Sequence, residues 1–395
     1  MIINDPVHGF IEIPEGLLSQ LVKHPWFVRL NRISQLGPTA YVYPGGCHSR
    51  FLHSIGTFHL ITEALNTLRR KGCDITPAEV EGAQAAMLLH DIGHGPMSHC
   101  LEGRFVPGMS HEQITLELMQ QLNLQYQGAL DLAISIFTDQ YPKHYLHELI
   151  CSQLDMDRLD YLCRDSFFAG VREGNIGAQR IIKMLNVSGN CLVVDAKGIY
   201  TLENYLMSRR LMYWQVYLHK TALAAQEVLT AAFDRAEEIG EWAGNPPLTP
   251  PRGRTGASPR GGLEGVQFLS LDDSDVIVRF KQWMGSDDRV LSLLATDYID
   301  RTLFKASELA GPPSDEQLLE QREAVARRFG ITIDEARYLV RYRRVSQTLY
   351  STSDDHIAVQ LKDGTVRDIS EFSELLHTRM VDSATNHHYL FVQRG

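Results

Sequence analysis

The sequence predicts a mainly α-helical protein, with a helical core, a short β-hairpin insertion and a small α+β lobe toward the C-terminal end. Three observations support this fold class. Apolar residues recur at helical spacing through most of the chain, capping boxes precede some of these segments, and β-branched runs are confined to a few short stretches. The chain has 395 residues and is 44% hydrophobic, which suits a globular protein with a sizeable core.

The clearest helix is predicted in "TPAEVEGAQAAMLLHD", residues 76–91. Thr76 stands at the N-cap and Glu79 follows three residues later, which forms a capping box around the proline at the first helical position. The apolar spacing then continues to the end of the segment. We therefore expect His90 and Asp91 at the C-terminal end of a largely buried helix, which the glycines that follow bring to a stop.

Other segments complete the prediction. A helix is expected from "SRFLHSIGTFHLITEALNTLRR", and the capping box "SHEQ" begins another at Ser110. The remaining predicted helices cover about 129–138, 146–168, 202–240, 274–284, 288–298, 315–328 and 333–347. β-Branched residues around a Lys-Gly turn predict a hairpin at 190–203, and further strands are expected in "HIAVQLKDGTVRDIS" and "HHYLFVQRG".

The domain organisation is predicted from composition. Residues 243–263 are dense in proline, glycine and arginine and carry few large apolar side chains, so we expect a flexible insert there. This insert would separate a core of residues 1–242 from a helical and α+β lobe of residues 264–395.

Charge and cysteine content narrow the class of protein. The formal net charge is -10 and the pI about 5.9, whereas a general nucleic-acid binder is usually basic. An anionic substrate must therefore be met by a local cluster of positive charge. The chain lacks an apolar run long enough for a membrane helix, its start does not resemble a secretory signal, and its six cysteines form no CxxC pair. We expect a cytoplasmic protein.

The segment "LLHDIGHGPMSH", residues 88–99, concentrates histidines beside an aspartate. His90 and Asp91 are neighbours at a predicted helix end and could both reach one metal ion. Taken alone, such a pair is more often an ordinary polar helix end. The choice between these interpretations depends on whether other segments supply further ligands.

Two neighbouring segments favour the metal site. His53 follows Arg50 by three residues, so the two share a helix face. In "SQLDMDRLDYLCRD" one continuous helix face carries Asp157, Tyr161, Arg164 and Asp165. Each pattern also occurs in ordinary amphipathic helices with a solvated polar face.

A third feature suggests acid chemistry. Glu102 follows His99 by three residues, and His111 stands at a predicted helix N-terminus. A carboxylate beside a histidine favours the protonated imidazole, which is the form that a general acid requires.

These pieces, in this order, resemble the HD-domain phosphohydrolase superfamily, whose signature is H…HD…D. The segments "DPVHGFIEI", "RISQLGPTAYVYPGGCHSRFLHSIG", "LLHDIGHGPMSH", "DMDRLDYLCRD" and "YLHK" resemble its deoxynucleoside triphosphate (dNTP) triphosphohydrolase branch. The resemblance covers roughly residues 1–230. It implies that residues 1–242 form a helical HD catalytic core, in which the metal ligands are His53, His90, Asp91 and Asp157.

The resemblance also implies roles for further residues. His94, His99 and His111 match histidines near the transferred phosphoryl group, with His99 as the acid and Glu102 behind it. The expected phosphate contacts are Arg50, Arg158, which replaces a lysine of the family, and Arg209. Tyr161, Asp165 and Tyr217 match sugar contacts, and Gln35 and Leu36 match residues beside the sugar and base.

The resemblance implies hydrolysis of dNTPs to deoxynucleoside and inorganic triphosphate. It implies one divalent transition metal (Mn, Fe, Ni or Zn), with Mg on the substrate phosphates as an option, and at least a homodimer. Two alternatives stay open at this point. One is an HD-family nucleotidase or phosphodiesterase for another nucleotide, and the other is a nucleic-acid-binding protein with a vestigial metal site.

Overall fold

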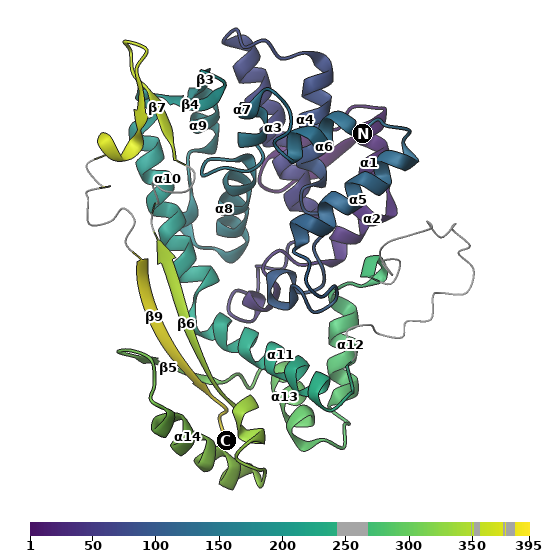
Figure 1. Ribbon diagram of the computed structural model, residues 1–395, viewed down its shortest axis with the longest axis vertical. Helices are drawn as coiled ribbons and strands as arrows, with labels where there is room; N and C mark the ends of the chain where they lie inside the picture. The colour runs from purple at the N-terminus through teal and green to yellow at the C-terminus, as the bar shows by residue number, and fades with distance from the viewer. Residues whose placement is uncertain (243–267, 349, 351–355, 374–375, 377–383) are drawn as a thin grey trace.

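Helix α3 (Arg50–Arg70) packs against both α4 (Pro77–Leu89) and α8 (Met156–Ala169), and the four predicted metal ligands lie on these helices or just after α4 (Figure 1). The computed structural model describes residues 1–242, 268–348, 350, 356–373, 376 and 384–395. The predicted insert 243–263 lies outside these described residues. The mainly α class with small sheets is confirmed.

The helices begin and end as follows: α1 Leu17–Lys23, α2 Pro25–Val28, α3 Arg50–Arg70, α4 Pro77–Leu89, α5 His111–Gln125, α6 Asp131–Phe137, α7 His144–Glu148, α8 Met156–Ala169, α9 Ala178–Met184, α10 Ile199–Met212, α11 Lys220–Glu238, α12 Asp273–Trp283, α13 Arg289–Ile299 and α14 Asp315–Phe329. The strands are β1 Ile2–Asp5, β2 Gly9–Glu12, β3 Leu185–Ser188, β4 Cys191–Asp195, β5 Lys305–Leu309, β6 Val340–Thr348, β7 Ala358–Gln360, β8 Val366–Asp368 and β9 Ala384–Val392. They form sheets in the orders β1-β2, β3-β4-β7-β8 and β5-β9-β6.

Helix α4 is surrounded by protein on nearly every side, because it packs against both α3 and α6. Its sequence is apolar almost all round, which is typical of a central helix. The predicted capping box at Thr76 and Glu79 is present, and His90 forms the C-cap. Helix α3 in turn packs on α8, so His53, His90 and Asp157 approach one another from three helices.

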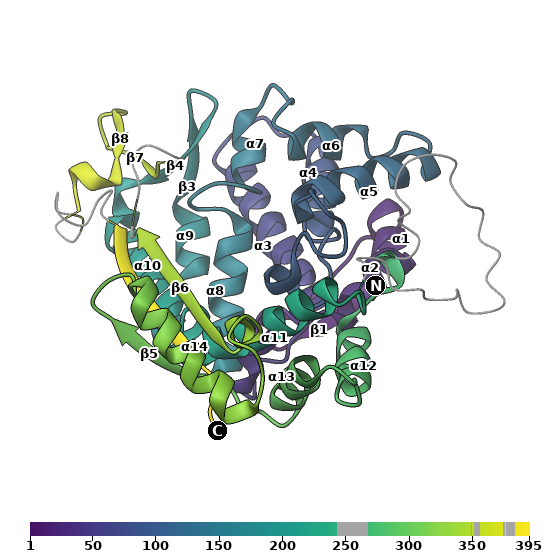
Figure 2. The same cartoon turned by 60° about the horizontal axis from the view of Figure 1, so that its bottom comes forward.

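The sheet β5-β9-β6 lies on the other side of the molecule from α4 and α6 (Figure 2). It packs against α11 and α14. Arg341 of β6 forms ion pairs with Glu227 at 3.0 Å and Asp234 at 2.7 Å, both on α11. These contacts join the C-terminal lobe to the helical core, and whether the two fold as separate units stays a prediction.

Several predicted elements differ from the structure. The predicted helix at 333–347 is wrong, because its main part is strand β6, which pairs along its whole length with β9. The predicted hairpin at 190–203 is shifted: strands β3 and β4 form it, and helix α10 begins at Ile199. The helix predicted at 146–168 is divided into α7 and α8, and a π-helical turn at Tyr213–Tyr217 interrupts the one predicted at 202–240.

None of the helices in the described ranges is both long and apolar enough to pass through a bilayer.

Glu79, the capping carboxylate of α4, also stabilises the core through its buried hydrogen bonds. Glu79 is 3% exposed and accepts hydrogen bonds from Tyr141 at 2.7 Å and from Lys143 at 2.8 Å. Burial would raise the pKa of Glu79, but these partners and Thr76 lower it to about 2. Because this pKa lies below that of the unfolded chain, the ionised carboxylate stabilises the fold above about pH 4.5 and loses this effect as the pH falls toward 2.

We expect Glu79→Gln to lower the free energy of unfolding at pH 7 by about 2 to 3 kcal/mol, measured by urea denaturation. The difference from wild type should shrink steadily from pH 5 downward. Glu81→Gln, at an exposed position on the same helix, is the matched control and should change little. An equal loss in both variants, or a loss independent of pH, would contradict this role for Glu79.

Candidate active site

Four side chains predicted as metal ligands meet at the centre of the helical core. His53 comes from α3, His90 and Asp91 from the end of α4, and Asp157 from the first turn of α8. His53 Nε2 lies 2.9 Å from Asp157 Oδ1 and 3.7 Å from Asp91 Oδ2. His90 Nε2 lies 3.4 Å from Asp91 Oδ1 and 3.7 Å from Asp157 Oδ1. The ligand atoms of His53, His90 and Asp91 all fall within 4.8 Å of one another.

The other ring nitrogens show which tautomer these imidazoles adopt. His53 Nδ1 lies 2.8 Å from Asp160 Oδ2, and His90 Nδ1 lies 2.7 Å from the carbonyl oxygen of Met87. Both partners are acceptors, so both Nδ1 atoms carry the proton. In the neutral rings the buried Nε2 atoms then present lone pairs toward carboxylate oxygens, and neither makes a hydrogen bond. Lone pairs and carboxylate oxygens repel one another at these distances, and a cation between them removes the repulsion. The four residues therefore fit a divalent metal ion.

The pKa shifts within the group also favour a cation at this place. Burial would lower the pKa of His53, but Asp157 and Asp160 raise it to about 10. Burial would raise the pKa of Asp157, but His53 and His90 lower it well below its usual range. The group therefore holds an excess of negative charge that favours positive charge between the rings, whether a proton or a metal ion.

Asp160, which the sequence analysis did not single out, supports this group from behind. Its carboxylate is fully buried and also receives His8 Nε2 at 2.6 Å. Arg164 donates to both of its oxygens, at 2.8 and 2.9 Å, and to Asp5 at 2.8 Å. The i, i+4 spacing of Asp160 and Arg164 was the only local sequence signal for this network.

Arg50, predicted as a phosphate contact, lies beside the metal group. Its Nη1 is 2.6 Å from Asp91 Oδ2 and its Nε donates to Ser98 Oγ at 2.8 Å. It is 3% exposed. In this state the guanidinium orients a predicted metal ligand, and its contact with a phosphate stays a prediction.

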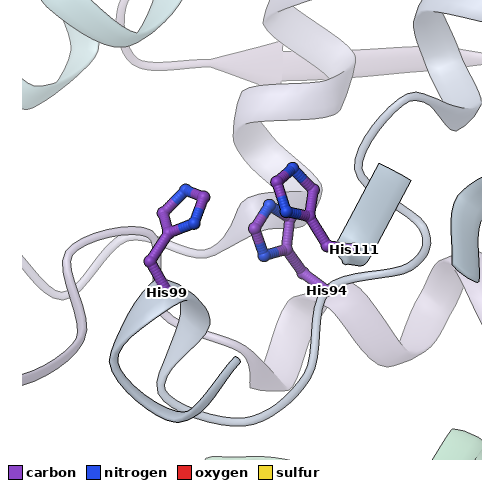
Figure 3. Close-up of side chains that lie close together, drawn as sticks. All are labelled: His94, His99 and His111. Carbon is purple, nitrogen blue, oxygen red and sulfur yellow. The ribbon is translucent and has the colours of Figure 1, made fainter. Parts of the chain in front are cut away.

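A second group consists of His94, His99 and His111 (Figure 3). His94 and His111 are stacked, with ring centroids 3.9 Å apart and planes 20° apart, and His99 lies edge-on to both. Ligand atoms of this trio also fall within 4.8 Å. The lone pairs of stacked rings lie in nearly parallel planes and do not converge on one point, so we assign the ion to the first group and anion contacts to this one.

Glu102 connects two of these imidazoles. One of its oxygens lies 3.0 Å from His99 Nδ1, and the other lies 2.7 Å from His111 Nδ1. Burial would raise the pKa of Glu102, but these partners and the backbone N–H of His111 lower it to about 2. Glu102 is therefore ionised at neutral pH, and both rings direct Nε2 away from it.

The three imidazoles differ in their tendency to be protonated. Burial and the charge of Arg50 hold the pKa of His94 well below its usual value, so this ring is neutral at pH 7. The surrounding protein and Arg50 also lower the pKa of His99, while Glu102 opposes them. Because the His99 ring is 64% exposed, solvent reduces the burial effect and the Glu102 contact favours its protonated form. His99 is thus the best placed of the three as an acid.

The predicted sugar contacts meet further along α8, beyond Asp157. Tyr217 donates to Asp165 Oδ2 at 2.6 Å, and the Tyr161 ring lies 6.1 Å from the Tyr217 ring. Burial, with the charge of Asp165, raises the pKa of Tyr217 well above its usual value, so its hydroxyl remains a donor. Tyr217 ends the π-helical turn, a rare conformation that is frequent at functional sites.

The remaining predicted residues border this region. Arg158 Nε donates to the Ser152 carbonyl at 2.7 Å, and Arg209 Nη1 donates to Gln153 Oε1 at 2.6 Å. Leu36 is buried, and the neighbouring Gln35 has a buried Oε1 without a hydrogen-bond partner in the described residues. Two guanidinium groups, one from α8 and one from α10, thus donate to neighbouring residues of the loop before α8, although the chain is acidic overall.

Comparisons with known proteins agree with this arrangement. The HD domain model matches residues 50–165, and the HD associated region model matches residues 176–244. The crystal structure of a phosphohydrolase from Bacteroides thetaiotaomicron is 45% identical, covers 100% of both chains and gives a TM-score of 0.91.

Two further relatives are more distant. The uncharacterized protein YwfO of Bacillus subtilis is 32% identical over 317 residues, which are 78% of this chain and 72% of YwfO. The human deoxynucleoside triphosphate triphosphohydrolase SAMHD1 is 31% identical over 287 residues, and the match spans 62% of this chain but only 46% of SAMHD1. HD domains are metal-dependent, which agrees with the ligand group at the centre of the core. The chain belongs to the HD-domain phosphohydrolases.

Proposed function

We propose that the protein hydrolyses dNTPs to a deoxynucleoside and inorganic triphosphate. The observation that carries this proposal is the order of groups along α8. Asp157 lies in the metal group, while Tyr161 and Asp165, one and two turns later, lie with Tyr217. One helix therefore presents a phosphate-cleaving group and a group that can accept a bond from a sugar hydroxyl, in the order in which a nucleotide carries phosphate and sugar.

The substrate would be bound by local positive charge. Arg50, Arg158 and Arg209 border the site of a chain whose net charge is -10. Guanidinium groups can each contact two phosphate oxygens and keep their charge at any physiological pH. On binding, each guanidinium would release its present protein partner and contact triphosphate oxygens instead. For Arg209 that partner is Gln153.

The divalent ion held by His53, His90, Asp91 and Asp157 would supply Lewis-acid chemistry, lowering the pKa of a water molecule and stabilising charge on phosphate oxygens. In the proposed reaction a water oxygen bonds to the α-phosphorus while the bond from that phosphorus to the 5′-oxygen breaks. His99 gives its proton to the departing 5′-oxygen, and Glu102 stabilises the imidazolium before transfer. His94 and His111 would donate hydrogen bonds to the reacting phosphoryl oxygens.

The similarity to SAMHD1 supports this substrate class, and the family supports hydrolysis of a phosphate ester or anhydride. The test is to incubate the purified protein with Mn²⁺ and each dNTP and to separate the products by anion-exchange chromatography. Deoxynucleoside with inorganic triphosphate is the expected result. Deoxynucleoside monophosphate with pyrophosphate would indicate cleavage at another bond, and no turnover of any dNTP would reject the substrate class.

A second prediction concerns the metal group. Asp157→Asn removes the negative charge of one ligand but keeps its shape, so we expect kcat/KM to fall by more than about 100-fold. Elemental analysis of the purified variant should show a matching loss of bound transition metal. Asp287→Asn, an exposed carboxylate outside the site, is the control and should retain both. Full metal content and activity in Asp157→Asn would exclude Asp157 as a ligand.

A third prediction concerns the acid. Glu102→Gln removes the charge that favours protonated His99, so we expect kcat to fall by about 10- to 100-fold with metal content unchanged. Glu102 opposes the lowering of the His99 pKa, so its loss lowers that pKa further. The alkaline limb of the kcat–pH profile should therefore move to lower pH.

The matched control is Glu112→Gln, whose carboxylate is 3.6 Å from His111 Nε2 and 65% exposed. It should leave the pH profile in place. An unchanged alkaline limb in Glu102→Gln would show that His99 is not the acid.

A further inference from the structure

His48 is a buried residue to which the sequence analysis gave no role. It lies just before helix α3, and its side chain is 0% exposed. His48 Nε2 is 2.8 Å from Asp165 Oδ1. Its Nδ1 is buried and has no hydrogen-bond partner among the described residues. A fully buried polar ring with a single polar contact indicates that this contact, to Asp165, is what the residue provides.

The contact with His48 helps to fix the orientation of the Asp165 carboxylate. A carboxylate is an acceptor, so His48 in its neutral form carries the proton on Nε2 and donates it to Oδ1. Tyr217 donates to the other oxygen, Oδ2, at 2.6 Å. With one donor on each oxygen, Asp165 is held in one orientation, while each oxygen keeps a lone pair for a further donor. That donor can be a substrate hydroxyl.

The backbone of His48 also holds the segment that carries Gln35 and Leu36. Its carbonyl oxygen accepts the backbone N–H of Gln35 at 2.9 Å, and an isolated bridge pairs Ser34 with Ser49. Its ring stacks on Phe168 of α8, with centroids 4.5 Å apart and planes 21° apart. Through its backbone and side chain, His48 thus joins the segment that carries Gln35 and Leu36 to the helix that carries Asp165.

We propose that His48 is a positioning residue that holds Asp165 as the acceptor for the 3′-hydroxyl of the substrate sugar and so determines selectivity for nucleotides that carry this hydroxyl. The inference rests on the proposed function. His48 acts through Asp165 and has no contact with the reacting phosphate. Without its N–H, Asp165 can turn away, and the advantage of a 3′-hydroxyl is lost while cleavage continues.

The test compares two substitutions that differ only in reach. The amide nitrogen of glutamine can occupy nearly the place of histidine Nε2, whereas that of asparagine corresponds to Nδ1 and falls short of Asp165. For wild type, His48→Gln and His48→Asn, kcat/KM is measured with a dNTP and with the matching 2′,3′-dideoxynucleotide. The ratio of the two values should fall about tenfold in His48→Asn and stay within about threefold of wild type in His48→Gln.

Phe168→Leu is the packing control. It removes the stacking contact of the His48 ring but leaves the bond to Asp165, so its selectivity ratio should match wild type even if its melting temperature falls. Binding of the 2′-deoxynucleoside and the 2′,3′-dideoxynucleoside, measured by calorimetry, provides a second readout that needs no turnover and is applied to every folded variant.

The outcomes separate the two proposals. A wild-type preference for the 3′-hydroxyl that persists in His48→Asn overturns the role of His48 and leaves dNTP hydrolysis standing. A wild type that neither hydrolyses dNTPs nor prefers the 3′-hydroxyl in binding overturns both. A fall of the ratio in His48→Asn with retention in His48→Gln supports both.

Discussion

The hydrogen bond between Asp160 and His53 Nδ1 is the interaction on which the rest of the site depends. It fixes the proton of His53 on Nδ1 and therefore directs the lone pair of Nε2 toward Asp91 and Asp157. Asp160 is itself fully buried and ionised, which is tolerated because Arg164 donates to both of its oxygens. Burial would raise the pKa of Asp160, but Arg164, His53 and His8 hold it well below its usual range. Loss of Arg164 would leave an uncompensated buried charge beside the metal group.

This network requires unusually close contact between chain segments, and glycines make it possible. At Gly56, in the middle of α3, an added Cβ would lie 2.1 Å from both Arg164 Nη2 and Asp160 Oδ1. At Gly93, after α4, an added Cβ would lie 2.2 Å from the carbonyl oxygen of His111. A glycine inside a helix costs about 1 kcal/mol relative to alanine. Here the lost side chain gives the space in which α8 approaches α3, and in which His111 approaches His94.

The sequence predicted the parts of the site that follow local rules. The capping box and apolar spacing of α4 placed His90 and Asp91 at a helix end, and the resemblance to HD-domain proteins added His53 and Asp157. Roles for Asp160 and His48 were not predicted from the sequence. Their partners, His53 and Asp165, lie 107 and 117 residues away, and no local spacing marks such pairs. Strand β6 was mistaken for a helix for a related reason. Its arginine-rich sequence suits either conformation, and pairing with β9, which follows much later in the chain, decides between them.

In the proposed reaction, water attacks the α-phosphorus of a dNTP and the bond from that phosphorus to the 5′-oxygen breaks. Turnover in ¹⁸O-enriched water, followed by mass spectrometry of both products, tests this directly. We expect one ¹⁸O atom in the inorganic triphosphate and none in the deoxynucleoside. Label in the 5′-hydroxyl of the deoxynucleoside, or in a nucleoside monophosphate released with pyrophosphate, would contradict it.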